Sequence, residues 1–314
     1  MISRRNIRVK VMQTLYSLET MTNGTDTGDG LKKSTPHQML QKHLEQTQEI
    51  FTYLLYHTVQ VALYAEKDAQ IKSSKHLPTE KDLHVNTKIA GNPFVWQLME
   101  DEGFQHKVKE WNLREYLDPE LIKKCYLQLI DTEDYQAYIA SPERNKTDER
   151  KILLYIFNDL LMKNELFDQH MEDLFMHWCD DKEMMLVLVN NYFQKPVLFN
   201  FIQLISKEKW DYARDLLQTV QDKKEYCLEQ IRPKLQNWDP DRIAAIDMLL
   251  MQMGVCEFLY FPTIPTKVTI NEYIDLAKSY STPQSGQFVN GILDNILKEL
   301  EAAQRIHKTD RARK

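Results

Sequence analysis

The sequence predicts an all-helical protein, and three observations lead to that class. Only 8 glycines occur in 314 residues, against roughly 22 expected at the usual frequency of about 7%. Leu, Gln, Lys, Glu and Met, which favour helices, are abundant. Apolar residues recur at the helical spacing in several segments, and 43% of the chain is hydrophobic, enough for real cores. Phosphate loops and many-turned β-sandwiches need glycine, so most nucleotide-dependent enzymes are disfavoured as well.

The first half of the chain divides at recognisable helix starts. A helix is predicted over about residues 3–19 with Ser3 as its N-cap, followed by a loop in the glycine-containing segment TNGTDTGDG. A long helix opens at Thr35 and Pro36 and runs to about residue 69. Residues 72–93 are polar and aperiodic, which indicates a linker or a surface excursion. Helices resume at Phe94, with further starts at Asp118 and at Thr147; the segment SPERN separates two of them.

The last hundred residues predict a compact helical bundle. One helix covers about residues 208–231, and a second starts at Asp239-Pro240. A capping box from Thr269 to Glu272 begins a third, and Ser285 caps the last. Gly291 lies inside that last helix at a cost of about 1 kcal/mol relative to alanine, so we expect another backbone to approach it closely. The apolar faces of the second and fourth helices consist of Ile243, Ile246, Leu249, Leu250 and Met253, and of Val289, Ile292, Leu293, Ile296 and Leu300.

Charge is distributed unevenly along the chain. The net charge of −6 combines +4 in residues 1–17 and +4 in residues 303–314 with −14 in residues 18–302. Basic extremities around an acidic body suit a protein that binds a polyanion at one place and a basic protein elsewhere, although charged termini can also be merely solvated. No apolar run reaches the roughly 18 residues of a membrane span, and the first residues lack a signal-peptide core. We expect a cytoplasmic protein without a membrane partner.

No arrangement of residues supports catalysis or a cofactor. The segment GDGLKKST lacks the order of residues in a phosphate loop. His177, Cys179, Asp180 and Asp181 form the densest group of possible metal ligands, but on a helix they cannot all face one point. No nucleophile has a matching base, and no carboxylate pair stands out. We therefore expect no enzyme activity, no metal and no cofactor.

Two segments favour anion or RNA binding. Arg4, Arg5 and Arg8 fall within roughly one 100° arc of the first helix, where cations oppose the helix dipole unless an anion binds. Tyr16 lies three turns further at a similar azimuth, and either offers a face to an unstacked base or packs against the bundle. At the start of the last helix, the N–H groups after Ser285 can receive a phosphate or a base edge, and Phe288 is expected to project outward.

Several segments together resemble the family of the bacterial transcription antitermination protein NusB. RRNIRVKVMQTLYSLE is similar to the opening arginine-rich helix of that family. NWDPDRIAAIDMLLMQMGVCEF, KVTINEYIDLAKSY and FVNGILD follow in the family's order and spacing. The resemblance implies NusB-like antiparallel helical bundles with an additional helical insertion. It divides the chain into the first, RNA-binding helix (1–20), a helical insertion of unknown role (21–207), the remainder of the NusB-like domain (208–305) and a basic tail (306–314).

The resemblance also implies a function. Members of that family bind single-stranded boxA RNA together with the small-subunit ribosomal protein NusE, within an antitermination complex of RNA polymerase. Asp247 matches an acidic family position at the ribosomal-protein interface. Asn6, Lys234 and Gln252 depart from the family pattern, and Lys234 can restore a phosphate contact. The RNA-binding positions that carry over, one by one, are Arg4, Arg5, Arg8, Tyr16, Lys234, Gln284, Ser285 and Phe288.

Two other functions are compatible with the same sequence. The chain can be a non-catalytic helical adaptor in which the insertion binds protein and the basic ends are inert. It can also be a NusB-like RNA-binding partner of a separate rRNA-modifying enzyme. The role of the insertion and the oligomeric state are left open by the sequence.

Overall fold

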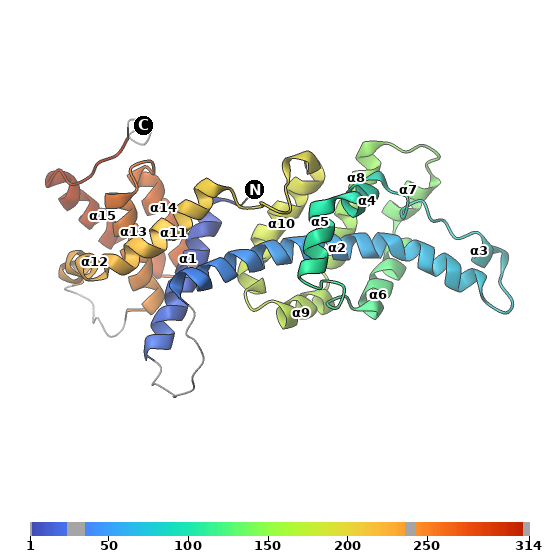
Figure 1. Ribbon diagram of the computed structural model, residues 1–314, viewed down its shortest axis with the longest axis horizontal. Helices are drawn as coiled ribbons and strands as arrows, with labels where there is room; N and C mark the ends of the chain where they lie inside the picture. The colour runs from blue at the N-terminus through green and yellow to red at the C-terminus, as the bar shows by residue number, and fades with distance from the viewer. Residues whose placement is uncertain (1, 24–34, 236–242, 310–314) are drawn as a thin grey trace. The chain divides into compact units, whose positions relative to one another are not determined.

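The protein is all-helical, as the sequence predicts. A computed structural model describes residues 2–23, 35–235 and 243–309, and these ranges contain helices, turns and connecting segments but no strand (Figure 1). None of the described helices combines the length and apolarity that a membrane crossing requires. The described residues form two compact units: unit 1 contains residues 45–204, and unit 2 contains residues 2–23, 35–44, 205–235 and 243–309. The four-part division made from the sequence stays a prediction.

Unit 2 is built from helices near both ends of the sequence. α13, α14 and α15 pack against one another, and α1 packs against α11 and α13. Its elements are α1 (Arg4–Asn23), the first turns of α2 (Pro36–Ser73), α11 (Lys207–Asp222), α12 (Lys224–Ile231), the short 3-10 helix η3 (Arg232–Lys234), α13 (Ala245–Tyr260), α14 (Thr266–Tyr280) and α15 (Ser285–Ala302).

Unit 1 contains most of α2, whose residues from Glu45 onward belong to it. From residue 50 to residue 59 every side chain of α2 is buried, so this helix supplies the centre of the unit 1 core. The other elements are α3 (Glu80–Leu83), α4 (Pro93–Glu100), α5 (Glu102–Glu110), α6 (Pro119–Ile130), α7 (Glu133–Ala140), α8 (Lys146–Tyr155), the π-helix η1 (Ile156–Leu161), α9 (Glu165–Leu174), α10 (Trp178–Gln194) and the 3-10 helix η2 (Pro196–Leu198).

Local capping signals place several helix starts correctly. Ser3 Oγ accepts from the Asn6 backbone N–H at 3.2 Å, and the Asn6 side chain accepts from the Ser3 N–H at 3.1 Å. Thr35 and Gln38 form the same reciprocal pair at the start of α2. Asp118 caps α6 as predicted. Such pairs satisfy two of the N–H groups that a helix start leaves without partners.

Three predicted boundaries are wrong because tertiary contacts decide them. The helix expected over 208–231 breaks at Lys223, which leaves α12 free to pack against α13. Thr269 lies inside α14 and caps nothing, since its hydroxyl donates to the buried Glu257. Ser285 follows the N-cap residue Gln284, and its hydroxyl donates to Asp247. The start expected at Asp239-Pro240 lies outside the described residues.

Glycine marks a close approach between helices, but at a different position from the one predicted. A Cβ added to Gly291 would meet nothing within 4 Å, so the close approach expected there is wrong. A Cβ on Gly254 of α13 would lie 2.9 Å and 3.0 Å from the two Cδ atoms of Leu293 on α15. The missing side chain at Gly254 therefore permits the tight packing of α13 against α15.

The two glycines provide a matched test. We expect Gly254→Leu to lower the free energy of unfolding by about 1–3 kcal/mol, because extra methylenes must displace Leu293. Gly291→Ala should instead raise it by up to about 1 kcal/mol, because alanine favours the helix and has room. Urea unfolding followed by circular dichroism measures both. Equal effects of the two substitutions would contradict this description of the α13 and α15 packing.

Candidate nucleic-acid interface

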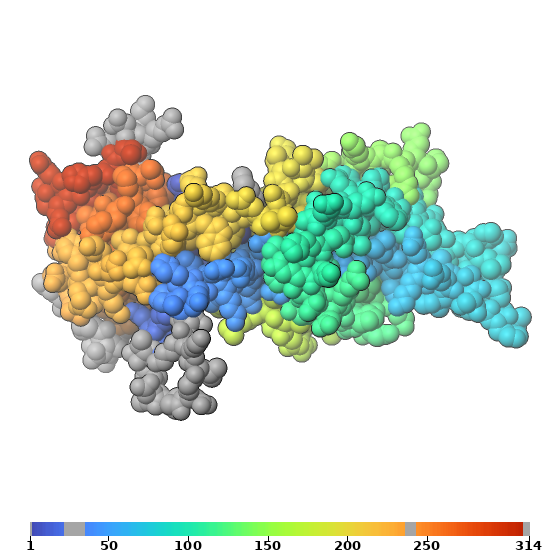
Figure 2. All heavy atoms as spheres, in the orientation of Figure 1, coloured from blue at the N-terminus to red at the C-terminus, as the bar shows by residue number. Residues whose placement is uncertain are grey.

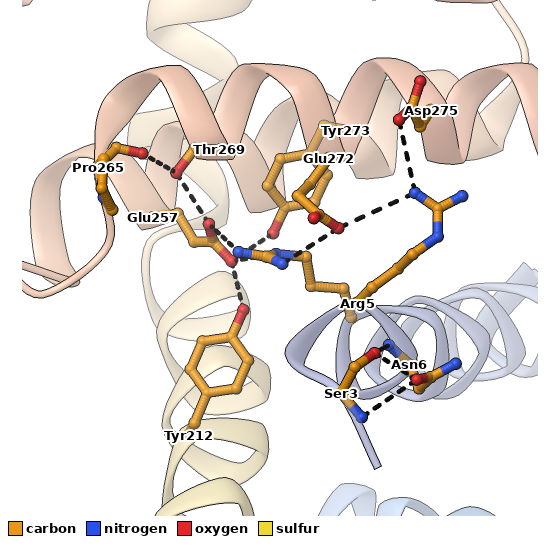
Figure 3. A network of polar contacts seen from close by, with 11 residues as sticks. Ser3, Arg5, Asn6, Tyr212, Glu257, Pro265, Thr269, Glu272, Tyr273 and Asp275 are labelled. Atoms are coloured by element: carbon orange, nitrogen blue, oxygen red, sulfur yellow. Dashed lines mark hydrogen bonds and ion pairs between the residues drawn. The ribbon is translucent and has the colours of Figure 1, made fainter. Parts of the chain in front are cut away.

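The geometry of the site depends on the carboxylate of Glu257, which lies on α13 and is fully buried. The Arg8 guanidinium of α1 donates to both carboxylate oxygens, from Nε to Oε1 at 2.7 Å and from Nη2 to Oε2 at 3.1 Å. The hydroxyls of Tyr212, Thr269 and Tyr273 donate to the same carboxylate (Figure 3). These residues come from α11 and α14, so one carboxylate connects four helices.

The electrostatics keep Arg8 and the two tyrosines of this network protonated, as their hydrogen bonds require. Burial lowers the pKa of Arg8, but the hydrogen bond and the charge of Glu257 outweigh burial and hold that pKa above its ordinary value. Burial, followed by the charge of Glu257, raises the pKa of Tyr212 and of Tyr273. At neutral pH, Arg8 is therefore a cation and both phenols are donors. Paired in this way, the buried charges fix the position of α1 against α13.

A lysine near the end of the sequence reaches the same region. Lys308 is 7% exposed, and its ammonium donates to the backbone carbonyls of Glu257 and Phe261 at 2.8 Å and 2.9 Å. Burial lowers the pKa of Lys308 to about 8. The C-terminal end of α13 is the negative end of the helix dipole, so a cation there is favourable.

Arg4 and Arg5 lie at the surface beside this network, with side chains 41% and 39% exposed. Arg4 Nη2 lies 2.7 Å from Glu208 Oε1. Arg5 Nη1 lies 3.8 Å from Asp275 Oδ2 and 3.9 Å from Glu272 Oε2 (Figure 3). Exposed ion pairs contribute only about 0–1 kcal/mol, so a phosphate can replace these carboxylates at little cost.

Arg8 and Tyr16, predicted to share a surface with these arginines, differ in exposure. Arg8 is only 2% exposed because Glu257 binds its guanidinium, so the described structure leaves no surface at Arg8 for direct contact with RNA. Its predicted place in the RNA interface is corrected to a positioning role. Tyr16 is 41% exposed, which leaves part of its ring accessible three turns along α1.

The positions that depart from the family pattern have local partners. Asn6 completes the capping pair with Ser3, a role that an arginine cannot fill. The Lys234 ammonium forms an ion pair with Glu299. Gln252 is buried on α13.

The structure brings together two residues that the sequence assigned to different partners. The Ser285 hydroxyl donates to Asp247 Oδ2 at 2.6 Å, and both side chains are buried. Asp247 Oδ1 is buried and accepts no hydrogen bond from the described part of the chain. Near them, Gln284 is exposed and Phe288 is half-buried. Within the described ranges, no hydrogen bond or ion pair joins Arg4 or Arg5 to Gln284 or Ser285.

Sequence reasoning missed the residues at the centre of the site. Glu257 gives a usable signal, because it and Asp247 are the only charged residues in the sixteen of α13. A charge in a helix that is apolar on all faces is buried and needs a partner. Tyr212 and Tyr273 give no local signal. Among the described residues, no group of three or more His, Cys, Asp or Glu side chains could hold a metal ion.

Fold and site together define a helical bundle domain formed by segments from both ends of the sequence, with a second helical unit between them. Residues 187–298 match the NusB family model. The transcription antitermination protein NusB of Methylacidiphilum infernorum is 41% identical over 101 residues, which cover 32% of this chain and 70% of that protein. The chain belongs to the NusB family.

Other relatives agree with this assignment. The transcription antitermination protein NusB of Salinibacter ruber is 44% identical over 101 residues, 32% of this chain and 63% of that protein, so the matched region spans less than two thirds of this relative. A solved structure of T. maritima NusB is 29% identical and covers 41% of this chain and 84% of that one, with a TM-score of 0.29. The family match does not include α1, so Arg4, Arg5 and Arg8 lie outside it.

The buried pair gives the second prediction. We expect Glu257→Gln to lower the free energy of unfolding by about 3–5 kcal/mol, because the buried Arg8 loses its bidentate carboxylate partner and keeps only the longer ion pair with Glu272 at 3.4 Å. Glu208→Gln is the matched control: it removes the exposed partner of Arg4 and should cost no more than about 1 kcal/mol. Urea unfolding compares the two variants. A loss at Glu257 as small as that at Glu208 would show that the carboxylate does not hold the helices together.

Proposed function

We propose that this chain is a transcription antitermination factor that binds boxA-type single-stranded RNA together with a ribosomal protein of the NusE type. In this proposal it acts in the cytoplasm, within an RNA polymerase antitermination complex, as a non-catalytic protein. Membership of the NusB family supports the role, since the named relatives are transcription antitermination proteins. The resemblance of α1 and of the FVNG segment to the family motifs supports the binding of boxA RNA and of the ribosomal protein.

The observation that carries the proposal is the exposure of Arg4 and Arg5 on α1, a helix that the buried ion pair between Arg8 and Glu257 fixes in position. Arg8 lies four and three residues after them, so the ion pair with Glu257 sets the rotation of α1 about its axis. The ion pairs of both exposed guanidinium groups are weak surface pairs, and Arg4 also lies 5.8 Å from the centre of the Tyr212 ring. Arginine forms bidentate hydrogen bonds to phosphate, and the partly exposed ring of Tyr16 adds a surface for stacking.

RNA binding is tested with Arg4→Ala combined with Arg5→Ala. The variant keeps the buried Arg8 and should stay folded, while its affinity for a boxA oligonucleotide falls. The salt dependence of log Kd should flatten by up to about 0.7 for each phosphate of single-stranded RNA that an arginine no longer neutralises. Filter binding at several salt concentrations, with and without the ribosomal protein, gives both numbers.

The control for this experiment is Lys298→Ala on α15, which removes an exposed cation that pairs within its own helix. Its affinity and salt slope should match those of the unchanged protein. If the double arginine variant behaves like the control while folded, α1 is not the RNA-binding element. If the unchanged protein binds no boxA RNA with or without the partner, the helical adaptor is the better description.

The ribosomal-protein contact is tested at Asp247. Asp247 is buried, so it acts through the Ser285 hydroxyl that it holds at the start of α15. We expect Asp247→Asn to weaken the complex up to about tenfold, because a neutral amide holds that hydroxyl about 1 kcal/mol less strongly than a carboxylate does. The change keeps the shape of the side chain and an acceptor for Ser285. Asp294→Asn is the matched control, because Asp294 is a half-buried aspartate on the same helix as Ser285, and it should leave the affinity unchanged. Isothermal titration with the purified ribosomal protein measures both, and equal affinities would remove Asp247 from the interface.

A further inference from the structure

Unit 1 contains a cavity of about 520 Å³ that neither the family match nor the proposed function explains. The residues that line it come from the first turns of α4 and α8 and from the end of α10 and the chain that follows it; α8 packs against both α4 and α10. Figure 2 shows the surface of α4 and α5 adjoining that of the segment after α10. A cavity of this size is in the range that ligand-binding sites occupy.

One side of the cavity is apolar and unusually exposed. Val197 and Leu198 of η2 are 88% and 67% exposed, and Phe94 and Pro196 line the cavity beside them. The exposed Ile202 follows a few residues later. Single exposed apolar side chains are common, but a cluster of them on a concave surface is typical of a binding site.

The other side of the cavity is cationic. Lys146, Arg150 and Lys195 line it, and no carboxylate does. Lys146 and Arg150 are four residues apart on α8, so they project from the same face of the helix. Arg150 Nη1 donates to Gln194 Oε1 at 2.8 Å, which holds its guanidinium at the rim. Among the described residues, none of the three cations has a carboxylate within ion-pair distance.

The acidic residues of α8 serve other contacts. Glu149 is buried, where it accepts from the Tyr138 hydroxyl at 2.8 Å and pairs with Arg144 at 3.0 Å. Asp148 accepts from Asn145 and lies in a separate hollow with Lys151. Positive charge is therefore concentrated at this cavity in a chain whose net charge is −6. Within unit 1, three cations without a carboxylate partner at one cavity attract an anionic ligand there.

We propose that this cavity binds a short segment of a partner protein in which apolar side chains are interspersed with carboxylates. The apolar residues would enter against Phe94, Val197 and Leu198, and the carboxylates would pair with the three cations at the rim. Peptide is favoured over RNA because the apolar part of the lining is aliphatic apart from one aromatic ring, which leaves no series of ring faces for stacked bases. The site is independent of the RNA function proposed for unit 2.

The test uses the full-length protein and three fluorescein-labelled peptides of equal length. GDLEFDLG carries both features, GNLQFNLG lacks the charges, and GDSESDSG lacks the apolar side chains. Fluorescence anisotropy should show binding of the first, at least tenfold weaker binding of the other two, and weakening of the first by added salt. Binding of GNLQFNLG as tight as that of GDLEFDLG, or no binding of GDLEFDLG at about 1 mM, would overturn the proposal.

Two variants locate the binding. Arg150→Glu combined with Lys195→Glu should weaken GDLEFDLG at least tenfold, and Leu198→Ser should weaken it while leaving the charges intact. Lys124→Glu, an exposed cation elsewhere in unit 1, is the control and should bind normally. Circular dichroism confirms that each variant is folded. Unchanged affinity in both cavity variants would place the peptide elsewhere, and loss of single-stranded RNA binding in the charge variant would identify a nucleic-acid site instead.

Discussion

The arrangement of unit 2 depends on one ion pair, between Arg8 of α1 and Glu257 of α13. Taking two charges out of water is costly, and the cost is offset only when every polar atom of the pair has a partner. Here the carboxylate receives the guanidinium and three hydroxyl groups, and Lys308 binds the adjoining carbonyls. Because the partners come from different helices, a shift of any one of these helices would break at least one of the hydrogen bonds.

The same turn of α1 thus holds two kinds of arginine with opposite requirements. Arg8 needs to be buried, because its attraction to Glu257 is strong only where water is excluded. Arg4 and Arg5 need to be exposed to solvent, so that their present carboxylate partners can be exchanged for other anions. The residue type alone does not distinguish the two. Depth in the fold does, and depth follows from the apolar residues around Arg8, beginning with Ile7 and Val9.

Interactions within a few residues were predictable from the sequence, and those across the fold were not. The caps at Ser3, Thr35 and Asp118 depend on neighbours within three residues, so the pattern predicts them. Thr269 and Ser285 show equally good local patterns, yet Glu257 and Asp247 take their hydroxyls. Gly254 and Gly291 carry the same local cost, and only the position of Leu293 shows which of them is needed. The all-helical class was predictable because helix-favouring residues are frequent, and glycines are few, along the whole chain.

The separation of Arg8 and Glu257 by 249 positions has a consequence for biosynthesis. During translation α1 leaves the ribosome long before α13 exists, and at about 5–20 residues per second the delay is on the order of ten seconds or more. Throughout that interval Arg8 lacks the carboxylate of Glu257, while residues 45–204 are made and have the contacts of their own core. All residues of unit 1 are thus synthesised before the buried ion pair of unit 2 can form, and of the helices that contribute to this ion-pair network α1 is synthesised first.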